Sequence, residues 1–111
     1  MVTTLDPARA ATLLADASVE VIDVRDADEY ATGHIPGARL LPLDALRADV
    51  EAQLRPGHAI VFVCASGTRS LGAAKLAERF GYANVYSLDG GTRGWARAGL
   101  PIEHEETRAA A

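Results

Sequence analysis

The segment HAIVFVCASGTRS, residues 58–70, joins a continuous apolar run to a short turn of small residues. The run from His58 to Ala65 shows no polar–apolar alternation, which is typical of a strand covered on both faces in a parallel sheet. Helical spacing resumes after the turn, and Gly81 ends it. The expected inner face of this helix carries Leu71, Ala74, Ala77 and Phe80. The segment therefore predicts a strand–turn–helix unit of an α/β fold.

The same alternation of strands and helices extends through the rest of the chain. Further strands are expected at residues 19–24, 38–43 and 84–88. Pro42 indicates that the second of these ends early or lies at a sheet edge. Expected helix starts are Asp6–Pro7, the capping box of Asp26 and Glu29, a cap at Asp44, and glycine-flanked residues after 90. The pattern predicts one domain over residues 1–104, followed by a disordered tail at 105–111.

Composition excludes several classes of protein. The 111 residues carry 11 basic and 15 acidic side chains, a formal net charge of −4, which does not indicate a nucleic-acid partner. Mean hydropathy is +0.04, and no apolar run approaches the ~18 residues of a membrane span. The first residues lack the basic and apolar regions of a signal peptide. We therefore expect a cytoplasmic protein without a membrane segment, with a monomer as the expected oligomeric state.

The chain has a single cysteine, Cys64, which cannot form an internal disulfide. This usage fits a reducing compartment. Three scattered histidines, His34, His58 and His104, together with one cysteine, do not match the four-ligand pattern of structural zinc. We expect no metal site. His34 lies in the sequence GHIPGA, where we expect its ring to bond the backbone rather than act at the site.

Cys64 stands where the expected buried strand stops, and the following residues turn the chain into a helix. A lone cysteine in this position is commonly a small core residue. Here, however, small residues and Gly67 let successive N–H groups point into one concavity, and a helix N-terminus faces the same point. Such donors lower a thiol pKa and favour the nucleophilic thiolate. Arg69 adds a planar fork of donors, expected to face an oxyanion.

Three segments together resemble the rhodanese family of sulfurtransferases. IDVRDADEYATGHIPGA (22–38) is similar to its N-terminal signature, CASGTRS (64–70) to its active-site loop, and LDGGTRGWARAGLPIE (88–103) to its C-terminal signature. The resemblance implies a central, mainly parallel five-stranded sheet with helices on both faces. It also implies that Cys64 accepts sulfur as a persulfide. The implied loop residues are Ala65, Ser66, Gly67, Thr68, Arg69 and Ser70, with Ser70 opening the helix.

The function implied by this resemblance is transfer of sulfane sulfur from thiosulfate or a persulfide to cyanide, a thiol or a protein. No cofactor is needed for double displacement at Cys64. One alternative is a sulfur carrier or sulfide sensor without turnover. A second is a phosphatase or arsenate reductase, which the loop length disfavours, because related phosphatases have five residues between cysteine and arginine. Only four separate Cys64 from Arg69.

Other signature residues leave further alternatives open. Asp23, Arg25 and Glu29 are expected to form a charged cluster, either supporting the Cys64 loop or fixing the start of a helix as a buried ion pair. Trp95 is expected to anchor the core. The backbone at Gly90 and Gly91 is expected to approach the Cys64 loop. Arg93 and Arg97, four residues apart, are expected on a solvated face, with recruitment of an anionic donor as the alternative.

Overall fold

The computed structural model describes residues 2–104, so the expected disordered tail at 105–111 lies outside the described residues. Its strands are β1 (Thr3–Leu5), β2 (Glu20–Asp23), β3 (Arg39–Leu40), β4 (Ile60–Val63) and β5 (Val85–Leu88). Its helices are α1 (Pro7–Leu14), α2 (Ala27–Thr32), α3 (Leu43–Ala48), α4 (Val50–Gln53), α5 (Thr68–Arg79) and α6 (Gly91–Arg97). None of the helices in this part of the chain has the length and apolar character needed to cross a membrane.

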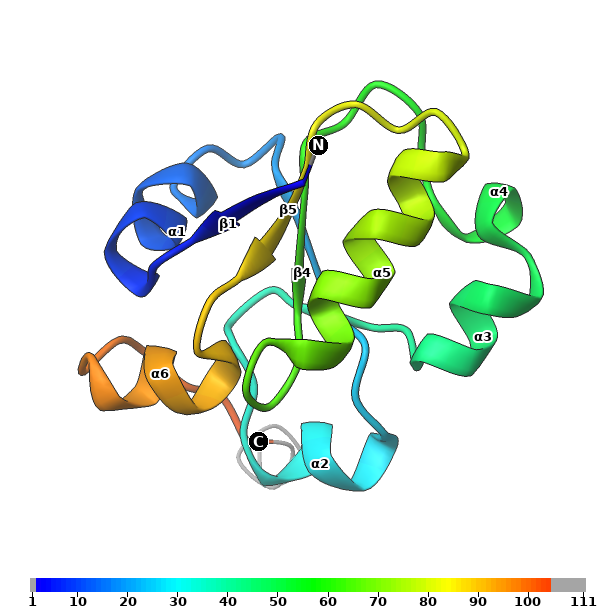
Figure 1. Cartoon of the computed structure of the whole chain (residues 1–111). Coiled ribbons are helices and arrows are strands. Elements are labelled where there is room, and N and C mark those ends of the chain that lie inside the picture. Colours follow the sequence, from blue (N-terminus) through cyan, green and yellow to red (C-terminus); the bar gives the residue numbers. More distant parts are fainter. Residues whose placement is uncertain (1, 105–111) are drawn as a thin grey trace.

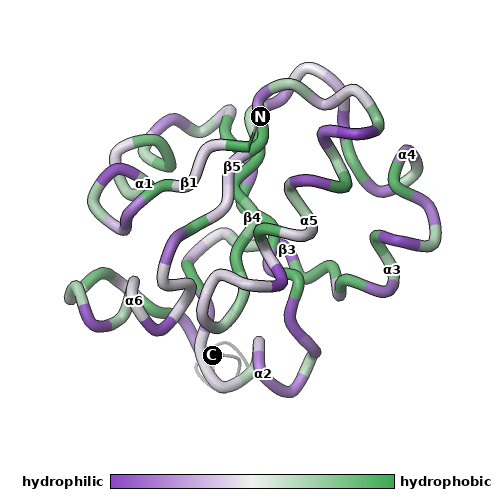
Figure 2. Tube along the Cα trace, viewed as in Figure 1, coloured by the Kyte–Doolittle hydropathy of each residue, from purple (hydrophilic) through white to green (hydrophobic). Residues whose placement is uncertain are grey.

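The five strands form one parallel sheet in the order β1-β5-β4-β2-β3. β4 lies at the centre, and Figure 1 shows α1 and α6 on one side of the sheet with α3, α4 and α5 on the other. Figure 2 shows hydrophobic residues along β4 and more hydrophilic residues on the outer helices. The predicted α/β fold, with a five-stranded sheet and helices on both faces, is confirmed.

Each face of the sheet has its own apolar core, and β4 contributes to both. Ile60 and Phe62 pack with the residues of α3, α4 and α5, whereas Val61 and Val63 pack with those of α1 and α6. All four β4 residues are fully buried, as the continuous apolar run predicts. Cys64 continues the alternation and belongs to the core on the α5 side.

Helix α5 differs from expectation at both ends. It begins at Thr68 rather than Ser70, because Gly67, with φ of +108°, already forms its N-cap. Its buried face consists of Ser70, Ala73, Ala74 and Ala77. Leu71 is only half-buried, and Phe80, which lies beyond the last helical residue, is 51% exposed. The buried face of α5 carries small side chains, which let the helix approach the sheet closely.

One other local prediction is wrong in detail. The expected single helix capped by Asp44 is two short helices, and Pro42 occupies the first N-cap. Asp49 interrupts the helix, and its carboxylate accepts a hydrogen bond from the Ala52 N–H at 3.1 Å. The edge position of the strand before Pro42 is confirmed, since β3 has two residues and pairs with β2 alone among the described strands. Strand β1 was not predicted.

Candidate active site

Cys64 follows β4 directly, at the carboxyl end of the parallel sheet. Ligand sites of open α/β sheets lie at this edge, where the loops between strands and helices converge. The residue is 1% exposed, so its sulfur is enclosed by the surrounding residues. Gly67 allows the loop that follows to turn sharply into α5, because its φ of +108° is a conformation that other residues rarely adopt.

The Cys64 sulfur is surrounded by hydrogen-bond donors. Its Sγ accepts hydrogen bonds from the Gly67 N–H at 3.1 Å and from the Ser70 N–H at 3.3 Å. The Ser70 hydroxyl lies 3.5 Å from Sγ and 2.8 Å from the hydroxyl of Ser87 on β5. The Ser70 hydroxyl also lies 3.2 Å from the Gly67 carbonyl, to which it donates; when Ser87 donates to Ser70, the single Ser70 proton is shared between that carbonyl and a thiolate at Sγ. The arrangement therefore stabilises negative charge on sulfur.

The balance of burial and hydrogen bonding lowers the pKa of Cys64 below its usual value of 9.0. Burial alone raises the pKa, because a charged group loses solvation. Hydrogen bonds from the Ser70 hydroxyl, and from the N–H groups of Ser70, Ser66 and Gly67, outweigh that effect. The expectation of an activated thiol thus agrees with the geometry. Ser87 was not predicted, although a polar residue in the apolar strand VYSL is a signal that could have drawn attention to it.

The first turn of helix α6 donates hydrogen bonds to the backbone of the Cys64 loop. The Thr92 N–H donates to the Cys64 carbonyl at 2.8 Å, its hydroxyl donates to the same oxygen at 3.2 Å, and the Arg93 N–H donates to the Ala65 carbonyl at 3.2 Å. A Cβ atom at Gly91 would stand 2.5 Å from the Cys64 oxygen. The expected close approach of the glycine pair is confirmed, and the part played by Thr92 is an addition.

Arg69 forms an ion pair with Glu29. Its two terminal nitrogens each donate to a different Glu29 oxygen at 2.9 Å. Arg69 lines a separate hollow of about 350 Å³ together with Asp26, Asp44 and Arg47. The structure thus places the Arg69 side chain between Glu29 and this hollow.

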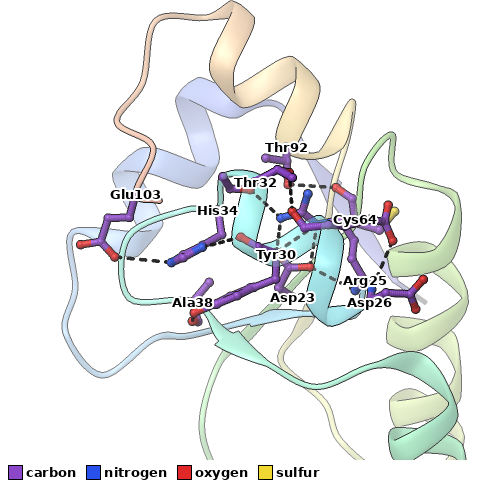
Figure 3. A network of polar contacts seen from close by, with 12 residues as sticks. Asp23, Arg25, Asp26, Tyr30, Thr32, His34, Ala38, Cys64, Thr92 and Glu103 are labelled. Atoms are coloured by element: carbon purple, nitrogen blue, oxygen red, sulfur yellow. Dashed lines mark hydrogen bonds and ion pairs between the residues drawn. The ribbon is translucent and has the colours of Figure 1, made fainter. Parts of the chain in front are cut away.

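The expected cluster of Asp23, Arg25 and Glu29 is divided into two ion pairs. Arg25 bonds the fully buried Asp23 at 2.8 Å, and the same nitrogen donates to the Gly33 carbonyl at the end of α2 (Figure 3). Glu29 bonds Arg69, as described above. Each of the two expected roles therefore applies to part of the cluster. Asp23 and Arg25 form a buried ion pair that holds α2 against the sheet, whereas Glu29 contacts the Cys64 loop.

His34 lies away from the cysteine, as expected. Its Nδ1 is 2.8 Å from the Tyr30 carbonyl, and its ring stacks on that of Tyr30 with centroids 3.7 Å apart. Nε2 lies 3.7 Å from the Glu103 carboxylate (Figure 3). Trp95 is buried, and its indole N–H donates to the Pro101 carbonyl at 2.7 Å. Both residues have the structural roles that the sequence predicted.

A cleft of about 580 Å³ opens next to the Cys64 loop. Its wall includes the loop residue Ala65, Thr92 and Arg93 of α6, and Thr32 at the end of α2. The wall is completed by Arg25, Glu29, Gly33, Ala96, Ile102 and His104. Within residues 2–104, no three His, Cys, Asp or Glu side chains are grouped as metal ligands would be.

A buried thiol at the end of a central strand, held by loop amides, is an arrangement found in known proteins. The model of the rhodanese-like domain matches residues 6–98. The chain belongs to the rhodanese-like domain family. Among curated relatives of this rhodanese-like domain, a thiosulfate sulfurtransferase GlpE from Stutzerimonas stutzeri is 35% identical over 102 residues, covering 90% of this chain and 92% of that protein.

Two further comparisons support the same family. A sulfurtransferase from Allochromatium vinosum is 36% identical over 103 residues, which cover 92% of this chain and 95% of the relative. The crystal structure of a rhodanese-related protein from Thermoplasma volcanium superimposes with a TM-score of 0.84 at 25% identity, covering 93% of this chain and 99% of that one. This rhodanese-like domain is accordingly a rhodanese-type sulfurtransferase.

Proposed function

We propose that this sulfurtransferase takes sulfane sulfur from thiosulfate or a persulfide and holds it as a persulfide on Cys64. The observation that carries the proposal is the hydrogen bonding of Sγ by the Gly67 and Ser70 N–H groups, at 3.1 and 3.3 Å. These donors lower the pKa of the thiol despite its burial. A thiolate at neutral pH is the form that attacks sulfur.

In the first step, the Cys64 thiolate attacks the outer sulfur of thiosulfate. A bond forms between Sγ and that sulfur, the bond between the two thiosulfate sulfurs breaks, and its electron pair leaves with sulfite. The negative charge of the product rests on the outer sulfur of the persulfide. The remaining loop N–H groups, from Ala65 to Arg69, are proposed to donate to this sulfur, because preorganised donors stabilise charge at little reorganisation cost.

In the second step, a thiophilic acceptor attacks the outer sulfur. The sulfur–sulfur bond breaks, and its electron pair returns to Sγ, which regenerates the thiolate. Cyanide accepts the sulfur in an assay, and a thiol or a protein accepts it in the cell. The two steps leave no net change in the oxidation state of the enzyme, so no cofactor enters the cycle. The single cysteine suits a reducing, cytoplasmic setting.

The short loop favours sulfur over phosphate as the transferred group. Four residues separate Cys64 from Arg69, and Gly67 already closes the turn at the head of α5. The guanidinium of Arg69 is bonded to Glu29 through both terminal nitrogens. A phosphatase must bind three charged phosphoryl oxygens, which takes a wider set of donors than one sulfur atom needs. Here the Sγ partners are a few short-range N–H and O–H groups, which suit a single sulfur atom.

The proposal is tested by comparing the wild type with Cys64→Ser in the thiosulfate:cyanide reaction. We expect the variant to form no thiocyanate, because a serine hydroxyl is almost un-ionised at neutral pH, and to keep its thermal melting temperature. Aryl-phosphate hydrolysis is measured in the same samples. Thiocyanate formation by a folded Cys64→Ser protein, or phosphate release by the wild type that depends on Cys64, contradicts the proposal.

A further inference from the structure

Three arginines surround the Cys64 loop, and two of them are already paired. Arg25 bonds Asp23 and the Gly33 carbonyl, and Arg69 bonds Glu29. Arg93 is exposed on α6, and its side chain makes no hydrogen bond or ion pair with any residue from 2 to 104. Arg93 is therefore the arginine beside the loop whose positive charge is available to a ligand.

The position of Arg93 is fixed relative to the catalytic loop. Its backbone N–H donates to the Ala65 carbonyl at 3.2 Å, and its side chain lines the 580 Å³ cleft. Arg69 does not line this cleft but the separate hollow near Asp26. Consequently a ligand in the cleft can have one end at the loop and another within reach of the Arg93 guanidinium.

The cleft is larger than an inorganic sulfur donor requires. A volume of about 580 Å³ lies within the range of roughly 300–1,000 Å³ for pockets that bind small organic molecules. Its wall combines apolar surface from Ala65, Ala96 and Ile102 with the charge of Arg93. Arg25 and Glu29 also line it, but their charges are paired with those of Asp23 and Arg69. Because Cys64 is 1% exposed, only a slender sulfur-bearing end can reach Sγ. The rest of the molecule must lie outside, and the cleft lined by the neighbouring residue Ala65 offers space for it.

We propose that this cleft is the acceptor subsite, and that the acceptor is a small organic thiol with a carboxylate that binds Arg93. The inference rests on the proposed function and specifies its second step. The acceptor thiolate attacks the outer sulfur of the Cys64 persulfide and becomes a persulfide itself. The sulfur–sulfur bond at Cys64 breaks, and its electron pair remains on Sγ. No oxidant or reductant takes part.

The test begins with the persulfide form of the full-length protein. The enzyme is treated with thiosulfate, excess donor is removed, and a mass increase of about one sulfur atom, ~32 Da, verifies loading. Loaded protein is then mixed with 3-mercaptopropionate, 2-mercaptoethanol or cysteamine, which are anionic, neutral and cationic thiols of similar size. The rate of loss of the added mass is expressed per concentration of acceptor thiolate. This rate per thiolate is then divided by the rate of the same thiolate with a small-molecule disulfide, because a thiolate of higher pKa is intrinsically more nucleophilic.

We expect the normalised rate of the wild type to be highest with 3-mercaptopropionate. Arg93→Gln should lower that rate about fivefold, the scale of a solvent-exposed charge contact, and leave the 2-mercaptoethanol rate unchanged. Arg97→Gln is the matched control, because Arg97 is also exposed on α6 but does not line the cleft. It should retain the full preference for the anionic thiol.

Three results overturn the inference, and they are distinguishable. Equal normalised rates for all three acceptors in the wild type mean that the cleft does not select charge. An equal loss for all three acceptors in Arg93→Gln means that Arg93 supports the loop instead of binding the acceptor. Absence of any persulfide after thiosulfate treatment contradicts the proposed function itself, and the acceptor subsite with it.

Discussion

Glu29 and Arg69 form a two-pronged ion pair in which each carboxylate oxygen lies 2.9 Å from one guanidinium nitrogen. The residues are 40 positions apart in the chain, and the pair joins α2 to the first turn of α5. Glu29 also accepts a hydrogen bond from the Asp26 N–H at 3.2 Å, which completes the cap of α2. The loop that carries Cys64 is thereby fastened to a neighbouring helix.

Removing either partner of this pair should weaken the loop in the same way. We predict that Glu29→Gln and Arg69→Ala each reduce sulfur transfer several-fold, and that the double variant loses little more than Arg69→Ala alone. The coupling free energy in urea unfolding should be about 0.5–1 kcal/mol, because both side chains are about one-third exposed (38% and 34%). A double-mutant cycle with kcat/KM and unfolding as readouts measures it.

The donor dependence of Arg69→Ala separates positioning from direct binding. If Arg69 acts through Glu29, thiosulfate and an organic persulfide should lose the same factor in kcat/KM. A loss confined to thiosulfate would show that Arg69 leaves Glu29 and binds the oxyanion of the donor, as the sequence predicted.

The ion pair should make stability depend on pH at the acidic end. Hydrogen bonds from Arg69, only partly opposed by burial, lower the pKa of Glu29 from 4.5 to about 2. A carboxyl group with a depressed pKa stabilises the folded state above its unfolded pKa, and this contribution is lost as the pH falls towards the folded pKa. We predict that the unfolding free energies of wild type and Glu29→Gln differ by a constant amount above about pH 5 and converge between about pH 4.5 and 2. Convergence already near neutral pH would contradict this assignment.

Ser87, on the neighbouring strand β5, should help to lower the pKa of the Cys64 thiol. Its hydroxyl is buried 2.8 Å from that of Ser70, which in turn lies 3.5 Å from Sγ. We predict that Ser87→Ala raises the pKa of Cys64, because Ser70 then donates less effectively to the thiolate. The pH dependence of iodoacetamide alkylation measures this pKa. An unchanged profile would mean that the loop N–H groups alone set the thiol pKa.

The backbone contact at Gly91 should be essential for the loop. Both Gly91 and Gly99 have positive φ, at +61° and +80°, but a Cβ at Gly91 meets the Cys64 and Ala65 carbonyls at 2.5 Å, whereas one at Gly99 meets nothing within 4 Å. We predict that Gly99→Ala costs about 1 kcal/mol and Gly91→Ala about 2–4 kcal/mol. Only Gly91→Ala should impair sulfur transfer. Urea unfolding and turnover assays compare the two variants. A similar loss of unfolding free energy in both would show that the Cys64 loop can shift to accommodate the Cβ atom at position 91.

Local sequence predicted most of the helices and strands and the position of Cys64 in the fold. The apolar run ending at Val63 predicted a central parallel strand, and the glycine-containing turn after it placed Cys64 at the carboxyl edge of the sheet. Boundaries were less accurate, because Gly67 caps α5 two residues earlier than expected and Asp49 interrupts what was expected as one helix. These details depend on backbone angles that neighbouring residues do not specify.

Partners distant in sequence were harder to predict. The contact of Arg69 with Glu29, and of Ser70 with Ser87, depends on how α2 and β5 pack against the loop. Spacing within a motif carries no information about such contacts. The sequence did group Glu29 with Asp23 and Arg25, but it could not show that the group divides into two pairs.

The most direct test of the account is the intact mass of the full-length protein after thiosulfate treatment. We predict a gain of about one sulfur atom, ~32 Da, that cyanide removes completely and that Cys64→Ser does not show. Peptide mapping should place the added sulfur on Cys64, the single cysteine of the chain. No mass gain in the folded wild type, or a gain that persists in Cys64→Ser, would contradict the proposal that Cys64 carries the transferred sulfur.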